Sequence, residues 1–193
     1  MLHGFIRRHN GSFVIPPDPV PGNLITEFAG INSAGVILGY TTPDGSFVGA
    51  RNFLLQNGVY TFLDGPPDAT LTQCLSINDR GQIAGTFDDS LGTHGFLLDN
   101  GVFTTIDFPN TVLTVALSIN NKGQIVGFFL DEQFSPRGFL LDRGVYFMLD
   151  FPGALETMPH TINDKGQIVG FYDVETGWVL GHGFVATPVR GRK

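Results

Sequence analysis

Apolar residues along this chain fall into short runs that are separated by tight polar turns. Within the stretch 114–150, apolar runs at 114–120, 124–129, 138–141 and 145–150 alternate with Gly-containing turns and one polar loop. Runs of this length, bounded by Gly, Asn or Asp, predict β-strands joined as hairpins. No window shows sustained apolar periodicity of 3.6 residues, so we expect little or no helix.

The same pattern of strands recurs four times. Each copy contains Ile-Asn, two further residues, a Gly, and a small apolar run that ends on a second Gly. The asparagines are Asn32, Asn78, Asn120 and Asn163, at spacings of 46, 42 and 43 residues. A fixed period of this size, with four short antiparallel strands per copy, is typical of one blade of a β-propeller.

We therefore predict an all-β fold: a single repeat domain over residues 1–193 that forms a small β-propeller of four blades, each with four antiparallel strands. The predicted units are 26–64, 72–107, 114–150 and 157–186, preceded by strands within 4–15. The fourth unit lacks an outer strand, so we expect both ends of the chain to complete the last blade and leave no open edge. One strand is then surplus, and it is either displaced or available to pair with a second copy of the chain.

Two glycines in each copy carry separate expectations. The first, three residues after each Asn, fits a turn position that needs positive φ. The second, seven residues after each Asn, lies inside a strand and indicates a bulge or a close approach of backbone. The two sets are Gly35, Gly81, Gly123 and Gly166, and Gly39, Gly85, Gly127 and Gly170.

Composition and charge narrow the class of partner. The net charge of −7 argues against a nucleic-acid partner, because phosphate binding needs a basic surface. No apolar run approaches the roughly 18 residues of a membrane span. We recognise no signal peptide, because His3-Gly4-Phe5 already belongs to the repeat. The single cysteine, Cys74, permits no intrachain disulfide and is expected to be a small buried hydrophobe.

Signals for catalysis and for cofactors are absent from the sequence pattern. No Ser-His-Asp spacing, phosphate loop or metal cluster can be recognised. His3, His94 and His182 occur one per unit, and equivalent positions of different blades are far apart unless they line the axis. We therefore expect no catalytic residue, no cofactor and no metal site.

Polar positions that are constant in every copy have two interpretations, a structural role or a role in binding. The asparagines lie at the first turn, where an Asn side chain hydrogen-bonds its own backbone. Six residues before each Asn stands a threonine at the start of the first strand, either as a structural residue or as part of a rim around a central channel. The threonines are Thr26, Thr72, Thr114 and Thr157.

Polar positions that differ between copies are the candidates for an asymmetric site. Glu27, Gln73 and His160, together with Glu156, fall near one mouth of the expected channel. The alternative is that these residues vary between copies because they lie in loops without a functional role. His160 with Glu156 or Glu27 also has the chemistry for acid–base work, which keeps an enzyme reading open.

The His-Gly-Phe tripeptides at 3–5, 94–96 and 182–184, with the Ile-Asn to Gly segments, resemble the bacterial "probable extracellular repeat" family, named for a His-Ala-Phe tripeptide. The copies Arg51-Asn52-Phe53 and Arg137-Gly138-Phe139 depart from this pattern. The resemblance implies an extracellular or cell-surface protein, and it implies no established activity and no catalytic residues.

Three functions follow as hypotheses. The first is a non-catalytic recognition module for a saccharide or another small ligand, at the channel mouth or on Trp178, whose indole is a candidate stacking platform or core residue. The second is a small enzyme, a lyase or hydrolase, that uses the channel mouth. The third is a structural domain that self-associates through the surplus strand.

Overall fold

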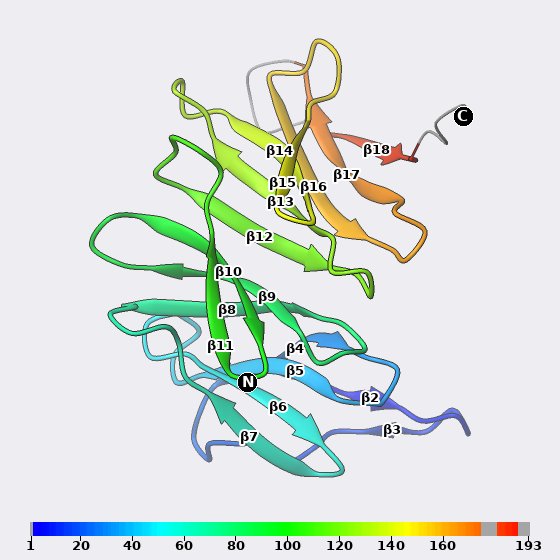
Figure 1. The fold of residues 1–193 in the computed structure, drawn as a ribbon. Helices are drawn as coiled ribbons and strands as arrows, with labels where there is room; N and C mark the ends of the chain where they lie inside the picture. Colours follow the sequence, from blue (N-terminus) through cyan, green and yellow to red (C-terminus); the bar gives the residue numbers. More distant parts are fainter. Residues whose placement is uncertain (1, 175–180, 189–193) are drawn as a thin grey trace.

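The computed structural model describes residues 2–174 and 181–188, and all regular structure in these residues is β-strand. Four small antiparallel sheets follow one another along the chain and stack face against face (Figure 1). Among the described residues no helix is long and apolar enough to cross a membrane. The prediction of an all-β protein is therefore confirmed.

Each sheet follows the chain in order from its first strand outward. Sheet 1 contains β4 (Ile25–Ile31), β5 (Ile37–Thr42), β6 (Arg51–Gln56) and β7 (Val59–Leu63). Sheet 2 contains β8 (Leu71–Ile77), β9 (Ile83–Asp88), β10 (Thr93–Asp99) and β11 (Val102–Ile106). Sheet 3 contains β12 (Thr114–Ile119), β13 (Ile125–Leu130), β14 (Pro136–Asp142) and β15 (Val145–Leu149). Sheet 4 contains β16 (Glu156–Ile162), β17 (Ile168–Asp173) and β18 (His182–Ala186).

The N-terminal strands differ from their predicted place. β1 (Leu2–His3) pairs in parallel with β4, and β2 (Ile6–Arg7) pairs only with β3 (Phe13–Val14). Within the described residues sheet 4 has three strands. Its third strand is β18 and not the N-terminal segment, which was the other candidate for this position. Completion of the last blade by both chain ends is therefore not observed, and a closed ring of four blades stays a prediction.

The hydrophobic core lies between successive sheets. One cluster joins Leu38 of sheet 1 to Cys74 and Phe96 of sheet 2. A second joins Ala84 of sheet 2 to Ala116 of sheet 3, and a third crosses from sheet 3 to sheet 4. Each sheet therefore buries its apolar side chains against its neighbours, which is the packing expected of a repeat array.

Both glycine predictions are confirmed. Gly35, Gly81, Gly123 and Gly166 have φ values of 75°, 76°, 80° and 76°. At the second set, a Cβ added at each glycine would overlap a carbonyl oxygen of the preceding strand, as at Gly127 against Val115. A register shift lies beside each of these close approaches, on β4, β8, β12 and β16.

The repeated asparagines form a ladder that crosses from sheet to sheet. The Asn120 Oδ1 atom accepts hydrogen bonds from the backbone N–H groups of Lys122 and Gln124, as the local prediction requires. Its Nδ2 group donates to the carbonyl of Asn163 over 2.9 Å. The corresponding bonds from Asn32 to Asn78 and from Asn78 to Asn120 measure 3.2 and 3.1 Å. The turns of neighbouring sheets are thus held in register by side-chain amides.

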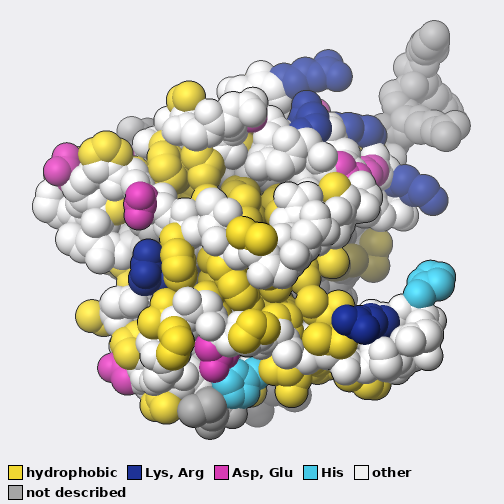
Figure 2. All heavy atoms as spheres, turned by 90° about the horizontal axis from the view of Figure 1, so that it is seen from below, with side chains coloured by type: hydrophobic (Ala, Val, Ile, Leu, Met, Phe, Trp, Pro, Cys, Tyr) yellow, Lys and Arg dark blue, Asp and Glu magenta, His cyan; other side chains and the backbone are white. Residues whose placement is uncertain are grey.

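An aromatic pair on the third and fourth strands also repeats. Its rings meet edge to face in sheets 1, 2 and 3, and in each sheet the third-strand phenylalanine is fully buried. Phe5 and Phe13 of the N-terminal hairpin form the same kind of pair, with centroids 5.4 Å apart, but both are more than half exposed. Figure 2 shows hydrophobic side chains gathered on this end of the stack.

Candidate binding clefts between the sheets

Three hollows lie along the stack. The hollow beside the paired strands β1 and β4 has a volume of about 280 Å³ and includes Thr26 in its wall. The hollow between sheets 1 and 2 measures about 250 Å³ and includes Thr72. The hollow between sheets 3 and 4 measures about 230 Å³ and includes Thr157. Two of the four predicted threonines thus border hollows between sheets, and a third borders the hollow beside β1 and β4.

The hollow between sheets 1 and 2 is here named the polar cleft. It is bordered by the polar residues Arg51, Asn52, Asp64, Thr70 and Thr72, with the loop that ends at Ala50 on one side. By contrast, Leu149, Phe184 and Val185 contribute much of the wall between sheets 3 and 4. The polar cleft therefore offers more hydrogen-bonding groups to a ligand.

Asn52 sets the spacing of the polar cleft. At the same position on the third strand, sheets 2 and 3 have Gly95 and Gly138, which approach the next sheet closely. A Cβ added at Gly95 would lie 3.3 Å from the Cβ of Ala116, and one added at Gly138 would lie 2.7 Å from Pro159. A glycine permits this close approach because it has no side chain.

Between sheets 1 and 2, hydrogen bonds of the Asn52 amide replace that close contact. Its Nδ2 group donates to the carbonyl of Thr72 over 2.8 Å, and its Oδ1 atom accepts from the N–H of Cys74 over 3.0 Å. Asn52 is 4% exposed, so these two bonds satisfy a buried amide. Asn52 therefore bridges sheets 1 and 2 where the other interfaces bring backbone and side chain into direct contact.

Arg51 and Asp64 border the polar cleft on neighbouring strands of sheet 1, and the alternation of side chains along β6 places the Arg51 side chain on the face opposite Asn52. Arg51 begins β6, and Asp64 follows β7. The Arg51 guanidinium lies over the ring of Phe62, with Cζ 3.6 Å from the ring centroid, which is the geometry of a cation–π contact. Across the part of the chain that is described, no carboxylate lies within ion-pair distance of Arg51.

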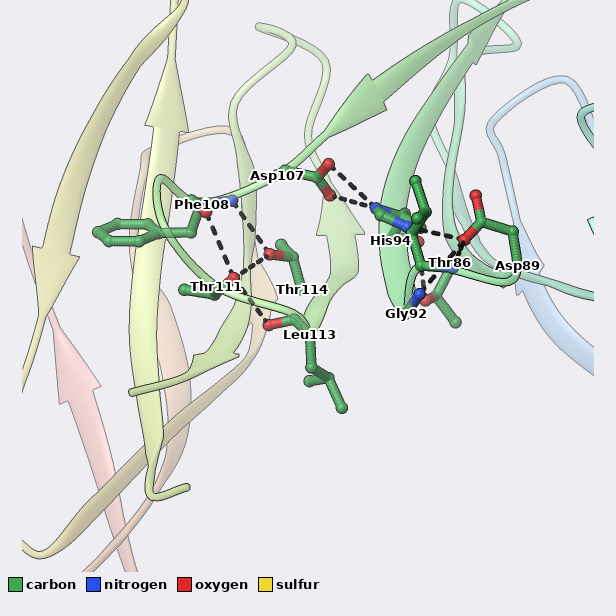
Figure 3. Close-up of polar contacts among 10 residues, drawn as sticks. Thr86, Asp89, Gly92, His94, Asp107, Phe108, Thr111, Leu113 and Thr114 are labelled. Atoms are coloured by element: carbon green, nitrogen blue, oxygen red, sulfur yellow. Dashed lines mark hydrogen bonds and ion pairs between the residues drawn. The ribbon is translucent and has the colours of Figure 1, made fainter. Parts of the chain in front are cut away.

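The equivalent residue in sheet 2 is His94, and it is held by two carboxylates. Nδ1 lies 3.0 Å from the Asp107 carboxylate, and Nε2 lies 3.2 Å from Asp89. Figure 3 shows Asp89 and Asp107 reaching His94 from opposite sides. Burial lowers the pKa of His94, but hydrogen bonds and charge from the two carboxylates outweigh it, and the net pKa is raised.

The equivalent residue in sheet 3 is Arg137, which also has a loop carboxylate as its partner. Its Nε donates to Asp131 over 2.7 Å, and this contact keeps the pKa of Asp131 lowered although burial opposes the shift. Asp150, thirteen residues after Arg137, has a raised pKa because burial and the charge of Asp131 outweigh the attraction of Arg137. A cation at this position with nearby carboxylates is thus a repeated feature.

Two predicted threonines have structural roles. Thr114 Oγ1 accepts a hydrogen bond from the N–H of Phe108 over 3.0 Å, and Thr157 Oγ1 accepts from the N–H of Phe151 over 3.1 Å. Both threonines are 1% exposed. Thr26 bonds to Asp18 and Thr41, whereas Thr72 makes no side-chain hydrogen bond to any described residue. Thr72 is therefore the threonine whose hydroxyl remains available in a hollow.

The other predicted site residues do not come together. Glu27 accepts a hydrogen bond of 2.7 Å from Tyr40 and raises the pKa of that tyrosine, with burial, to about 12. Gln73 lies on β8 and His160 on β16, and β4 and β16 lie in different parts of the stack (Figure 1). Trp178 lies outside the described residues. A ligand role for these four residues stays a prediction.

Sequence reasoning missed Arg51, Asn52 and Asp64. The signal was present, because Arg51-Asn52 is the copy that departs most from His-Gly in the repeated tripeptide. The departure alone, however, assigns no role to these residues. Among the described residues no group of three or more His, Cys, Asp or Glu side chains could hold a metal ion.

No protein-family model matches the chain, and no curated protein matches it. Among solved structures it is similar to TolB from Acinetobacter baumannii, with a TM-score of 0.60 and 17% sequence identity. That likeness covers 95% of this chain and 48% of TolB, so the chain spans about half the length of that protein. At this identity the similarity shows the fold alone.

Two lectins show weaker structural similarity. One is the SapL1 lectin in complex with alpha methyl fucoside, at a TM-score of 0.47 and 13% identity, covering 95% of this chain and 73% of that chain. The other is a triple arginine-to-alanine mutant of AofleA from Arthrobotrys oligospora, at 0.45 and 15%, covering 89% and 61%. TM-scores below 0.5 are too low to establish that these two proteins share the fold of this chain.

Proposed function

We propose that the protein is a non-catalytic recognition module for a hydroxyl-rich small ligand, of which a saccharide is the best fit. The observation that carries this proposal is the polar cleft between sheets 1 and 2. Arg51, Asn52, Asp64 and Thr72 border it, and the Thr72 hydroxyl, which can both donate and accept hydrogen bonds, makes no side-chain hydrogen bond to any described residue. A sugar ring presents hydroxyl groups that both donate and accept, so it complements such a wall.

The size and setting of the cleft support a small ligand. Its volume of about 250 Å³ is slightly below the common range for drug-sized ligands, and suits a single ring or the end of a longer chain. Strands of two packed sheets hold the wall, and the cross-sheet bonds of Asn52 brace it. A wall fixed by a scaffold binds with less loss of conformational freedom than a mobile one.

A titration followed by NMR tests this proposal. Saccharides from a panel of monosaccharides and disaccharides are added to the isotope-labelled protein, and backbone amide shifts are followed. We expect shifts at Arg51, Asp64 and Thr72 with at least one saccharide, and weaker binding by Asp64→Asn. Asp142→Asn, at the end of β14 in sheet 3, is the control variant. Shifts confined to other surfaces, or none with any saccharide, would contradict the proposal.

Three broader hypotheses of the sequence analysis stand as proposals beside it. We propose membership of the "probable extracellular repeat" family and a place outside the cell or at its surface, and the recurring His-Gly-Phe and Ile-Asn segments support both. Self-association through the N-terminal strands is the third, supported by the exposed Phe5–Phe13 pair. Sedimentation of the purified chain would reveal it as a concentration-dependent mass.

A further inference from the structure

We propose that the protein assembles head to tail, with sheet 4 of a second copy docked on sheet 1 and on the N-terminal hairpin β2–β3 of the first. This inference rests on the proposal of self-association and names the two surfaces that meet. Its basis is that one kind of sheet-to-sheet interface occurs three times within the chain. Each end of the stack presents one unmatched half of the same interface.

The N-terminal segment lies on sheet 1 where the third and fourth strands of a preceding sheet would lie. β1 pairs in parallel with β4, and a parallel bridge joins sheets 2 and 3 at the corresponding place. A Cβ added at Gly4 would lie 2.6 Å from the ring of Phe28. Gly138 approaches Pro159 in the same way, and Phe28 and Pro159 both stand four residues before a repeated asparagine. Gly4 therefore packs on sheet 1 as the third strand of sheet 3 packs on sheet 4.

The hairpin β2–β3 has the register of a third and a fourth strand. Ile6 lies opposite Val14, as Leu97 lies opposite Thr104 in sheet 2. Its exposed aromatic pair makes the edge-to-face contact that these two strands make in sheets 1, 2 and 3. Within the described residues β2 pairs only with β3, so no second strand lies beside it. The hairpin is therefore the outer half of a sheet, and its inner edge can accept a strand.

The missing inner half leaves one end of β4 uncovered. Ile31, the last residue of β4, is 64% exposed. Its equivalents in sheets 2, 3 and 4 are at most 8% exposed, and each lies in a buried cluster with the second strand of the preceding sheet. These equivalents are Ile77, Ile119 and Ile162. Ile31 thus lacks the second strand that would cover it.

Sheet 4 exposes the matching residue at the other end of the stack. Val169 on β17 is 44% exposed, whereas its equivalents on the second strands of sheets 1, 2 and 3 are fully buried. These equivalents are Leu38, Ala84 and Val126, and they share clusters with the buried isoleucines of the next sheets. Val169 and Ile31 are therefore the two unmatched halves of an apolar contact that occurs three times within the chain.

The asparagine ladder has matching ends as well. Asn163 Nδ2 donates to Gln167 within its own turn, but it has no described acceptor in another sheet. At the other end, the Asn32 carbonyl accepts from the N–H of Gly35 over 3.0 Å. A carbonyl oxygen has two lone pairs, and the other repeated asparagine carbonyls accept from the preceding sheet as well. Asn163 of one copy can therefore donate to Asn32 of the next as a further rung.

The two surfaces must come from different copies, because one chain holds them apart. Sheet 4 packs against sheet 3, and Figure 1 shows it at the opposite end of the stack from β2–β3. The edge of β17 that the hairpin would take is occupied by β18, which has the same His-Gly-Phe sequence as the segment that leads into β2. The hairpin brings a fourth strand that β18 lacks in the described residues, so β2 replaces β18 in the assembly. Such a contact joins unlike surfaces and builds a ring or a filament.

Cross-linking between two engineered cysteines tests this arrangement. With β2 in the place of β18, Ile6 lies opposite Val169, as Val185 does in the single chain. Side chains opposite each other on antiparallel strands have Cβ atoms about 4.5–5.5 Å apart, within reach of a short thiol cross-linker. Burial raises the pKa of the Cys74 thiol to about 12, so this native cysteine reacts little at neutral pH.

Ile6→Cys protein mixed with Val169→Cys protein should yield a covalent dimer. The control mixture replaces the second variant by Val145→Cys, at an exposed valine of sheet 3. We expect the first mixture to cross-link at least about tenfold faster than the control, because docking raises the local concentration of the two thiols.

A charge in the docked interface should prevent the assembly. Ile31 is exposed in the single chain, so Ile31→Asp is expected to fold. The buried carboxylate would oppose docking, and the sedimenting mass should fall to that of one chain. Val145→Asp is the matched control and should leave the mass unchanged.

The outcomes separate this inference from self-association itself. If the wild-type chain sediments as a single copy at all concentrations, both proposals fail. If it associates, but the Ile6–Val169 mixture cross-links no faster than the control, self-association stands and this interface is overturned. If the double variant Ile6→Cys/Val169→Cys cross-links only within one chain, the ring closes within that chain and a second copy is overturned as the occupant.

Discussion

His94 and Asp107 are joined by two contacts of equal length, because Nδ1 of the imidazole lies 3.0 Å from each carboxylate oxygen. Asp89 contacts the other ring nitrogen. A neutral imidazole donates from only one nitrogen, so both carboxylates are satisfied only when the ring is protonated. This arrangement ties the loop between β9 and β10 to the end of β11.

The first prediction is a loss of stability as the pH rises. The folded-state pKa of His94 is raised above its unfolded value of about 6.5, so the stabilisation is fully present below that pH. It is lost as the pH rises through the folded pKa. Because the pair is partly exposed, we expect an effect of about 1 kcal/mol or less. Thermal unfolding between pH 5 and 9 measures it.

The control for this prediction is His94→Arg. Arg137 occupies the equivalent position of sheet 3 and pairs with Asp131, so an arginine is compatible with this site. The variant keeps its charge across the range, and the difference in melting temperature from wild type should vary with pH. A difference that stays constant from pH 5 to 9 would rule out His94 as the titrating group.

The second prediction concerns the asparagine ladder. Asn120→Ala removes four hydrogen bonds from a side chain that is 4% exposed, and should lower the free energy of unfolding by about 2–4 kcal/mol. Asn163→Ala removes the same local bonds but no described cross-sheet bond, and its side chain is exposed. It should cost about 1 kcal/mol less. Urea denaturation measures both, and equal losses would contradict the cross-sheet role.

The third prediction separates two kinds of glycine. At Gly81 nothing lies within 4 Å of an added Cβ, so Gly81→Ala should cost only the strain of a positive φ, about 1–2 kcal/mol. At Gly127 an added Cβ would overlap the carbonyl of Val115, and Gly127→Ala should cost about 3 kcal/mol or more. Denaturant midpoints measure the order, and a reversed order would show that the strand can move aside.

The fourth prediction separates two threonines. Thr114→Val leaves the Phe108 N–H without its acceptor and should destabilise the protein by about 1–3 kcal/mol. Thr72→Val removes a hydroxyl with no described partner and should change stability by less than about 0.5 kcal/mol, while weakening any ligand in the polar cleft. If Thr72→Val destabilises as strongly, its hydroxyl has a structural role like that of Thr114.

Much of the fold could be predicted because it depends on local chemistry repeated in each copy. The Asn–Gly turns set the hairpins, and short apolar runs set the strands. The fate of the N-terminal segment could not be predicted in this way. Gly4-Phe5 and Gly183-Phe184 are equally good sequences for one strand, and only long-range packing decides which is used.

The candidate site was harder to predict than the fold. Thr72 was identified from its position in the repeat. Arg51 and Asn52 stand out only when they are compared with the residues at the equivalent positions of sheets 2 and 3. Asn52 can be recognised as a spacer only once Gly95 and Gly138 are known to face the next sheet. Strand register shows that Arg51 lacks the loop carboxylate that contacts His94 and Arg137, because Pro43 stands at the position of Asp89 and Asp131.

The asparagine ladder has a consequence for how the molecule opens. Each rung connects only adjacent sheets, so loss of one rung weakens one interface and leaves the next intact. Sheets 2 and 3 have a neighbour on both faces, and their unfolding must break two interfaces. Amide protons of β9 and β13 should therefore exchange with solvent last, while outer sheets fray and close again many times before the centre is exposed.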